Sequence, residues 1–514
     1  MSKMATYEPT RREFLLTGLA AAVCQTVVWG QAGDLATLTV KQASDLIRRR
    51  DVSALELTEA CLRRIDAFNP SLNAFVTVAR EQASETARQL DAERRRGGWR
   101  GPLHGIPVAL KDNIDTAGIR TTGASTLFKD RIPAEDAHVV ARLTQAGAII
   151  LGKLNLHEFA LGGTNAVTHF GPVRNPWAMD HHPGGSSGGN AAAVAADLCL
   201  ATLGTDTGGS IRIPSSYCSV VGLKPTAGRV SNHGVIPNSW SFDTVGPMCK
   251  TTEDAAFVLH AIAGYHERDP LSVDRAVPDY ARALRARVSK LRIGIPRQPF
   301  FEGLEPEVAK AVEAALVVLR GLVSEVKEVQ VPASPGLGAV SNAEIYAFHA
   351  PWITKTPELY QDATRRIIMG GATARPEAYI EGWRRLELAR REIVSSFASI
   401  DVLVTPTTTG VTSLIPQQAS GRGATPVAAP GAGRGPAAGG GAPGFRNTSY
   451  FSYYGLPAIS IPCGFTAAGL PIGLQIAGAP FAESTVLAVA YAYEQATEWH
   501  KRRPALRAAS GVDR

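Results

Sequence analysis

The sequence lacks several features that would assign it to a specialised class of protein. Its 514 residues contain no uninterrupted apolar run of about 18 or more, the length that a membrane-spanning helix needs. Its 6 cysteines stand at wide, irregular spacings, which indicate neither a disulfide framework nor a Cys-x-x-Cys metal site. The 53 Lys and Arg exceed the 46 Asp and Glu only slightly and form no long run, so we expect no nucleic-acid partner. With 45% hydrophobic residues the chain can bury a large core, which indicates a globular protein.

The N-terminus resembles a twin-arginine export signal. Arg11 and Arg12 precede a mostly small, apolar and uncharged stretch that ends at Gly30 and is short for a stable membrane span. We predict a signal peptide over residues 1–32 and a mature chain over residues 33–514. The expected location is periplasmic or secreted, with the twin-arginine export machinery as a partner during secretion. A cytoplasmic tail with a chance arginine pair, or an uncleaved anchor, is the alternative.

Apolar runs alternate with helical patterns, which predicts an α/β protein. Residues 106–110 predict a buried strand that ends at Lys111. Ser53 and Glu56 form a capping-box pattern at the start of an expected helix. The other expected strands are residues 146–151, 291–296, 401–404, 458–462 and 472–476, and the expected helices are residues 54–67, 135–145, 191–196, 305–324 and 483–499.

Residues 419–444 consist mostly of Gly, Ala and Pro. Such a segment buries too little apolar area to offset the entropy of ordering it, so it predicts a loop. Core-like sequence continues on both sides of it. We therefore predict a loop insertion within a single domain.

Two clusters rich in Gly and Ser carry the strongest chemical pattern. Residues 184–190 read GGSSGGN and residues 204–212 read GTDTGGSIR, which place Ser186 and Ser210 in similar surroundings. Glycine lets the backbone approach a ligand closely and turn its N–H groups toward developing negative charge. The clusters therefore indicate acyl transfer by a serine, whose hydroxyl needs a nearby base.

Lysine and histidine are the candidates for that base. An apolar strand delivers Lys111 toward the interior, where loss of hydration disfavours the ammonium form. Its pKa would have to fall from about 10.4 to about 7, at a cost of about 4 kcal/mol. Taken by itself, Lys111 is better explained as an ordinary surface lysine. We interpret the histidines ahead of Ser210 as surface or packing residues, and they are His104, His157, His169, His181 and His182.

Further motifs make the chain similar to the amidase signature family from about residue 40 to about residue 505. The motifs beside the two clusters are VALKDN at residues 108–113, NPW at 175–177, VGLKPT at 221–226 and GLPIGLQ at 469–475. The resemblance implies an α/β/α sandwich with a large mixed central sheet covered by helices on both faces. It implies neither a metal nor a cofactor.

The resemblance also implies a Ser–Ser–Lys triad. Ser210 would attack the carbonyl carbon, Ser186 would relay the proton and Lys111 would accept it. In the family the relay serine follows a cis peptide bond, here Gly185-Ser186. The implied oxyanion hole consists of backbone N–H groups of Thr207, Gly208, Gly209 and Ser210. The implied supporting residues are Ser187 and Asp206, which would hold the loop by hydrogen bonds. Arg212 would form a structural pair and would not bind substrate.

Other patterns compete for the same residues. Residues 184–188 fit the G-x-S-x-G nucleophile elbow, but the polar, proline-ended sequence ahead of them is no strand. Residues 147–153 fit a phosphate-binding loop, but Leu154 replaces the required Ser or Thr and the interior predicts a strand. His157 lacks the second histidine of a zinc-binding helix.

We therefore predict an exported amidase that hydrolyses the C–N bond of a small-molecule carboxamide through an acyl-enzyme and releases ammonia or an amine. One alternative is the glutaminase subunit of a tRNA-dependent amidotransferase, against which the export signal argues. The other is a catalytically silent binding protein, against which the intact triad argues. Segments expected to line the substrate pocket are residues 162–165, 343–352 and 405–409; the aromatic side chains of the second segment form either a pocket wall or core packing.

Overall fold

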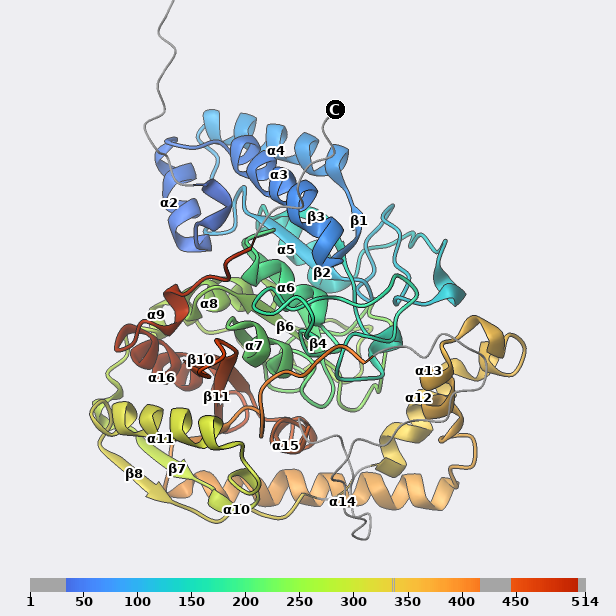
Figure 1. Ribbon diagram of the computed structural model, residues 1–514, viewed down its shortest axis with the longest axis vertical. Helices are drawn as coiled ribbons and strands as arrows, with labels where there is room; N and C mark the ends of the chain where they lie inside the picture. The colour runs from blue at the N-terminus through green and yellow to red at the C-terminus, as the bar shows by residue number, and fades with distance from the viewer. Residues whose placement is uncertain (1–33, 335, 337, 417–444, 507–514) are drawn as a thin grey trace, which may run out of the picture.

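The computed structural model describes residues 34–334, 336, 338–416 and 445–506, and its strands form one mixed sheet (Figure 1). The 11 strands lie in the order β1-β3-β2-β4-β6-β5-β10-β11-β9-β7-β8. Parallel pairs join β3, β2 and β4 in one part and β8, β7 and β9 in another, and the other pairs are antiparallel. The strands are β1 (Phe75–Val78), β2 (Pro107–Lys111), β3 (Ile149–Leu154), β4 (Ala201–Asp206), β5 (Val221–Lys224), β6 (Thr244–Cys249), β7 (Arg292–Ile295), β8 (Glu325–Glu328), β9 (Val402–Pro406), β10 (Ala458–Phe465) and β11 (Pro471–Gly478).

Helices cover the sheet in two layers. One layer includes α6 and α7, which pack against each other, and the other includes α8, α9 and α16, which also contact one another. Between them lies a continuous apolar core. The helices are α2 (Val40–Arg49), α3 (Ala54–Leu72), α4 (Arg80–Arg95), α5 (His138–Gln145), α6 (Gly188–Ala195), α7 (Arg212–Cys218), α8 (Thr252–Ile262), α9 (Tyr280–Ala283), α10 (Arg297–Phe300), α11 (Pro306–Arg320), α12 (Gly338–Ile353), α13 (Asp362–Met369), α14 (Pro376–Ser395), α15 (Arg446–Tyr453) and α16 (Glu483–Gln495).

The strands β2 and β4 bring the two ends of the expected site together. They are parallel neighbours, with Leu110 opposite Leu203, and every residue of both strands is buried. Their carboxyl ends, Lys111 and Asp206, therefore lie at the same edge of the sheet. This edge is where α/β sheets commonly bind ligands.

The predicted α/β class and mixed central sheet are confirmed, with shifts at the element ends. The predicted capping box at α3 is present, because Ser53 and Glu56 accept each other's backbone N–H groups. The expected strand at residues 146–151 begins late, at Ile149, because Gly147 turns the chain with φ +86°. The predicted signal peptide at residues 1–32 and loop at residues 419–444 lie outside the described residues.

Three helices after β8 form a lobe beside the sheet (Figure 1). α12 packs on both α13 and α14. The aromatic side chains of α12 belong to a core cluster, in which Phe348 and Trp352 pack against each other and Trp352 meets Phe128 edge to face. Core packing is therefore the better explanation of this predicted pocket segment.

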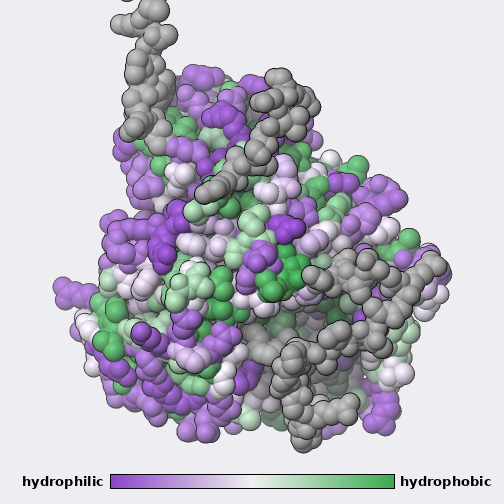
Figure 2. All heavy atoms as spheres, viewed as in Figure 1, coloured by the Kyte–Doolittle hydropathy of each residue, from purple (hydrophilic) through white to green (hydrophobic). Residues whose placement is uncertain are grey.

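Figure 2 shows one face of the molecule, with hydrophilic residues dominating its upper and lower-left parts and hydrophobic residues gathered nearer its centre. Among the described helices none is both long and apolar enough to cross a membrane. The five described cysteines are buried and unpaired: Cys61, Cys199, Cys218, Cys249 and Cys463.

Candidate active site

The candidate site lies where β2 and β4 end and where α6 and α7 begin. Lys111 is the last residue of β2, and Thr205 and Asp206 close β4. Ser186 stands just before α6, and Ser210 just before α7. Four separate parts of the chain thus meet at one place.

Lys111 is completely buried, and two hydroxyl groups contact its amine. Its Nζ lies 2.7 Å from Ser186 Oγ and 2.7 Å from Thr205 Oγ1, with the carbonyl oxygen of Thr205 at 3.4 Å. Burial lowers the pKa of Lys111 from 10.5 to about 7, partly opposed by the negative charges of Asp243 and Asp206. A substantial fraction of the amine is therefore uncharged near neutral pH.

The contacts of Thr205 suit the neutral amine. An uncharged amine has two N–H groups and one lone pair. The hydroxyl and carbonyl oxygens of Thr205 can each accept a hydrogen bond from one of these N–H groups. The lone pair is then available to the hydroxyl proton of Ser186. Asn113 Nδ2 donates to Thr205 Oγ1 at 3.3 Å and so helps to hold the threonine.

Ser186 follows a cis peptide bond, Gly185-Ser186, as the resemblance implies. The segment at residues 162–165 lies directly behind this bond, since a Cβ on Gly185 would come within 3.0 Å of the Asn165 nitrogen. His157 donates its backbone N–H to the Ser186 carbonyl at 3.2 Å. This part of the predicted pocket lining therefore adjoins Ser186.

Ser187 connects the two glycine-rich loops. Its N–H donates to the Ser210 carbonyl at 3.1 Å, and its hydroxyl donates to the Thr205 carbonyl at 3.2 Å. Ser210 itself is 4% exposed, and its hydroxyl has no hydrogen-bond partner in the described part of the chain. The hydroxyl is thus free to meet a ligand.

The four predicted oxyanion-hole N–H groups differ in what they contact. The N–H of Gly209 donates to Asp206 Oδ1 at 2.8 Å. Within the described residues the N–H groups of Thr207, Gly208 and Ser210 have no acceptor. These three are therefore the groups that remain for a bound oxygen atom.

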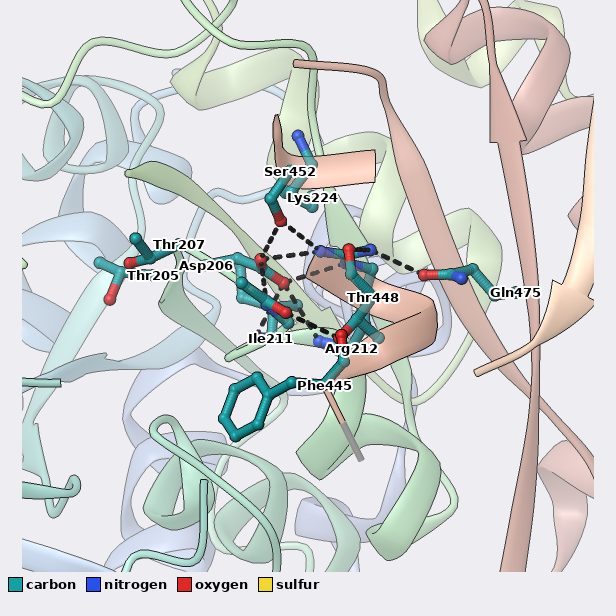
Figure 3. Close-up of polar contacts among 12 residues, drawn as sticks. Thr205, Asp206, Thr207, Ile211, Arg212, Lys224, Phe445, Thr448, Ser452 and Gln475 are labelled. Atoms are coloured by element: carbon teal, nitrogen blue, oxygen red, sulfur yellow. Dashed lines mark hydrogen bonds and ion pairs between the residues drawn. The ribbon is translucent and has the colours of Figure 1, made fainter. Parts of the chain in front are cut away.

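Asp206 and Arg212 form the polar cluster that holds this loop, together with Thr448, Ser452 and Gln475 (Figure 3). Both are fully buried, and Arg212 Nη2 donates to Asp206 Oδ1 at 2.9 Å. Arg212 also donates to Thr448 and Ser452 of α15 and to Gln475 of β11. The contacts agree with the expected structural pair and tie the loop to the C-terminal part of the sheet.

The sequence assigns no role to three nearby residues and predicts only a surface or packing position for a fourth, His157. Thr205 holds Lys111, and Asp243 accepts a hydrogen bond from Thr207 Oγ1 at 2.5 Å. The ring of Phe445 lies against Gly163 and Gly208, where a Cβ would come within 2.5 Å and 3.7 Å of it. His157 is buried near Lys111, and burial lowers its pKa to about 3.

Only one of these four residues carries a signal in the sequence. Thr205 belongs to the second glycine-rich cluster, so its place beside the site could have been found there. Asp243, His157 and Phe445 reach the site through chain folding. In the described part of the chain, no group of three or more His, Cys, Asp or Glu side chains could hold a metal ion.

Comparisons with known proteins agree on the family. The profile of the family described as Amidase matches residues 56–487. A glutamyl-tRNA(Gln) amidotransferase subunit from Moorella thermoacetica is 41% identical over 500 residues, which cover 92% of this chain and 99% of that protein. The protein of the same name from Geotalea daltonii is 40% identical over 505 residues, which cover 92% of this chain and 100% of that protein.

Solved structures of similar shape include a peptide amidase and a cyclic dimer hydrolase. The native peptide amidase from Stenotrophomonas maltophilia has a TM-score of 0.78 and 32% identity, with 93% of this chain and 99% of that chain covered. A 6-aminohexanoate cyclic dimer hydrolase complexed with substrate has a TM-score of 0.81 and 27% identity, with 91% and 99% covered. The chain therefore belongs to the amidase signature family and is an enzyme that acts on amide C–N bonds.

Proposed function

We propose that this enzyme hydrolyses a carboxamide through Ser210, with Ser186 as proton relay and Lys111 as base. The observation that carries the proposal is the 2.7 Å contact between Lys111 Nζ and Ser186 Oγ in a fully buried setting. A lysine in water would hold its proton at neutral pH, whereas the buried amine has a pKa of about 7. It can therefore take a proton near neutral pH.

The reaction then has two halves. Ser210 Oγ bonds to the carbonyl carbon while its proton moves to Ser186 and the proton of Ser186 moves to Lys111. The carbonyl oxygen becomes an oxyanion that accepts N–H bonds from the loop of Thr207 and Gly208. When the C–N bond breaks, the amine leaves with the proton returned through Ser186.

Water completes the cycle. It attacks the acyl ester on Ser210, and its proton follows the same path to Lys111. The ester C–O bond then breaks, Ser210 regains its proton, and the carboxylic acid leaves. Each proton that Lys111 accepts is returned in the same half-reaction.

Glutamine is the first substrate to test. The relatives named as glutamyl-tRNA(Gln) amidotransferase subunits reach 41% identity over nearly their whole length. They support glutamine hydrolysis beside a partner subunit more strongly than the stand-alone exported amidase that the sequence predicts. The peptide amidase and the cyclic dimer hydrolase support a stand-alone amidase as the second candidate.

A substrate panel separates these candidates. Ammonia release from glutamine, with no turnover of aryl amides or peptide amides, would favour the amidotransferase role. Turnover of a peptide amide or aryl amide by the isolated chain would favour the stand-alone amidase. In either case Ser210→Ala should abolish turnover with little change in melting temperature, while Ser71→Ala on α3 should leave turnover unchanged.

We also propose export through residues 1–32, supported by Arg11 and Arg12 ahead of the apolar stretch. Export and amidotransfer on tRNA exclude each other, because charged tRNA stays in the cytosol. Cell fractionation of the full chain tests this, with Arg11→Lys plus Arg12→Lys as the variant and Arg95→Lys plus Arg96→Lys as control. An uncleaved chain that stays in the cytosol would contradict export.

A further inference from the structure

Asp243 lies between the candidate site and a neighbouring segment of the chain. Its Oδ1 accepts the hydroxyl of Thr207 at 2.5 Å. Its Oδ2 accepts the backbone N–H groups of Asn238 at 2.8 Å and Ser239 at 3.1 Å. The carboxylate thus joins the segment at residues 238–243 to the loop that offers N–H groups to a bound oxygen.

The helical lobe holds the other side of this segment. Ser239 Oγ donates to Glu344 Oε2 of α12 at 2.6 Å, and Ser241 N–H donates to the same oxygen at 3.0 Å. Tyr379 of α14 donates to Glu344 at 3.1 Å. A continuous set of hydrogen bonds therefore runs from the lobe through Asp243 to Thr207.

Asp243 also differs electrostatically from the other carboxylate near Lys111. Asp206 forms a fully buried ion pair with Arg212. Asp243 has no such pair in the described residues; burial raises its pKa to about 6, and Lys111 is the charged group that opposes this shift, so Asp243 is a carboxylate at pH 8. His157, which also faces Lys111, is kept uncharged by burial.

We propose that Asp243 is a positioning residue of this site, which fixes the oxyanion loop through Thr207 and balances the charge of Lys111 when the amine takes the proton of Ser186. The inference rests on the proposed function. Before the reaction the amine is neutral and gains little from the carboxylate. Once the amine is protonated, the unpaired carboxylate stabilises it, and this is the state that forms as Ser210 attacks.

A sulfonyl fluoride tests the proposal without the natural substrate. Ser210 Oγ bonds to sulfur, the S–F bond breaks, fluoride leaves, and the hydroxyl proton passes through Ser186 to Lys111. The rate of covalent labelling, followed by intact-protein mass spectrometry from pH 5 to 9, reports how well the serine is activated. The pH 5 to 9 range brackets the pKa of about 7 for Lys111.

Two variants separate the charge of Asp243 from its hydrogen bond with Thr207. Asp243→Asn removes the charge, so labelling at pH 8 should slow about tenfold and the acid limb should move about one pH unit lower, because Lys111 becomes a weaker base. Thr207→Val removes the hydrogen bond between Thr207 and Asp243 but keeps the charge of Asp243. Labelling should therefore slow about tenfold, with the acid limb of the pH profile unchanged. Thr207→Ser restores the hydroxyl and should restore the rate.

Asp269→Asn is the matched control. Asp269 also accepts a backbone N–H of this region, from Asn232 at 2.7 Å, and it exerts no resolved effect on Lys111. It should leave both the rate and the limb unchanged. An Asp243→Asn profile that matches wild type would overturn the inference while Ser210→Ala still abolishes labelling. Absence of labelling in the wild type, or labelling that persists in Ser210→Ala, would overturn the proposed function and this inference with it.

Discussion

Two neighbouring strands of the sheet each carry a buried lysine near the carboxyl end, and only one of these lysines contacts the glycine-rich loops. Lys111 ends β2, and Lys153 is next to last in β3; both are completely buried. Burial lowers the pKa of Lys111 to about 7 and that of Lys153 to about 8. Desolvation alone therefore does not distinguish a base from a structural amine.

The partners of the two amines do distinguish them. Lys153 Nζ donates to the Ile114 carbonyl and, at 3.0 Å each, to the hydroxyls of Thr116 and Thr121. These three acceptors match the three N–H bonds of an ammonium group, and Asp112 adds a favourable charge. Lys111 has two close hydroxyl partners, and one of them, Ser186, can donate its proton to the lone pair of the amine.

The largest expected effect is on activity. Lys111→Met should reduce amide hydrolysis by about 10³-fold, because among the described residues no other group contacts Ser186 Oγ as a base. Lys153→Met should keep near-wild-type activity per folded molecule. Initial rates normalised to the folded fraction measure both, and comparable losses in the two variants would end the functional distinction between these lysines.

The effect on stability should have the opposite order. Lys153→Met leaves three acceptors and the Asp112 charge without their partner, so the free energy of unfolding should fall by about 3 kcal/mol. Lys111→Met should instead stabilise the protein at pH 6, because folding holds the Lys111 pKa below its unfolded value of 10.5 and so penalises the charged form. That gain should shrink as the pH rises past about 7 toward 10.5. Urea unfolding at pH 6 and pH 9 measures it, and a Lys111→Met gain independent of pH would argue against a depressed pKa.

The pH dependence of kcat/KM should also distinguish Lys111 from Lys153. Since only neutral Lys111 accepts a proton, kcat/KM should rise about tenfold per pH unit below about pH 7 and level off above it. Lys153→Gln should leave the position of this limb unchanged in the fraction that folds. A profile that is flat from pH 5 to 9 would contradict Lys111 as the base.

The smallest effects concern the threonines that hold each amine. Thr205→Val removes an acceptor from Lys111 and should lower kcat about tenfold, because the lone pair no longer points steadily at Ser186. Thr121→Val removes one of three acceptors from Lys153 and should cost about 1 kcal/mol of stability with kcat unchanged. Steady-state kinetics and thermal melts of both variants give the comparison; a kcat loss in Thr121→Val equal to that in Thr205→Val would contradict it.

Much of the fold follows from patterns that are local in the chain. The capping box at Ser53, the apolar strand ahead of Lys111 and the helix predicted over residues 191–196 depend on neighbours in sequence; each is present, and the helix begins three residues early, at Gly188. The late start of β3 did not follow from the apolar pattern, because Gly147 adopts a turn with φ +86° and packs so closely on the His104 backbone that a Cβ would come within 2.9 Å of it. Similarly, burial of His157 arises from distant segments and not from its own surroundings in the chain.

The order and spacing of the glycine-rich clusters are properties of the chain, so the amino-acid sequence alone was enough to indicate the family and to point to Ser186, Ser210 and Lys111. What depended on folding was the burial of Lys111 against Ser186 and Thr205, the occupied N–H of Gly209 and the contact of Asp243 with Thr207. A lysine loses its charge through desolvation and through its hydrogen-bond partners, and both depend on packing. Ser186 and Thr205 stand 75 and 94 residues from Lys111 in the chain, so packing alone brings them to its amine.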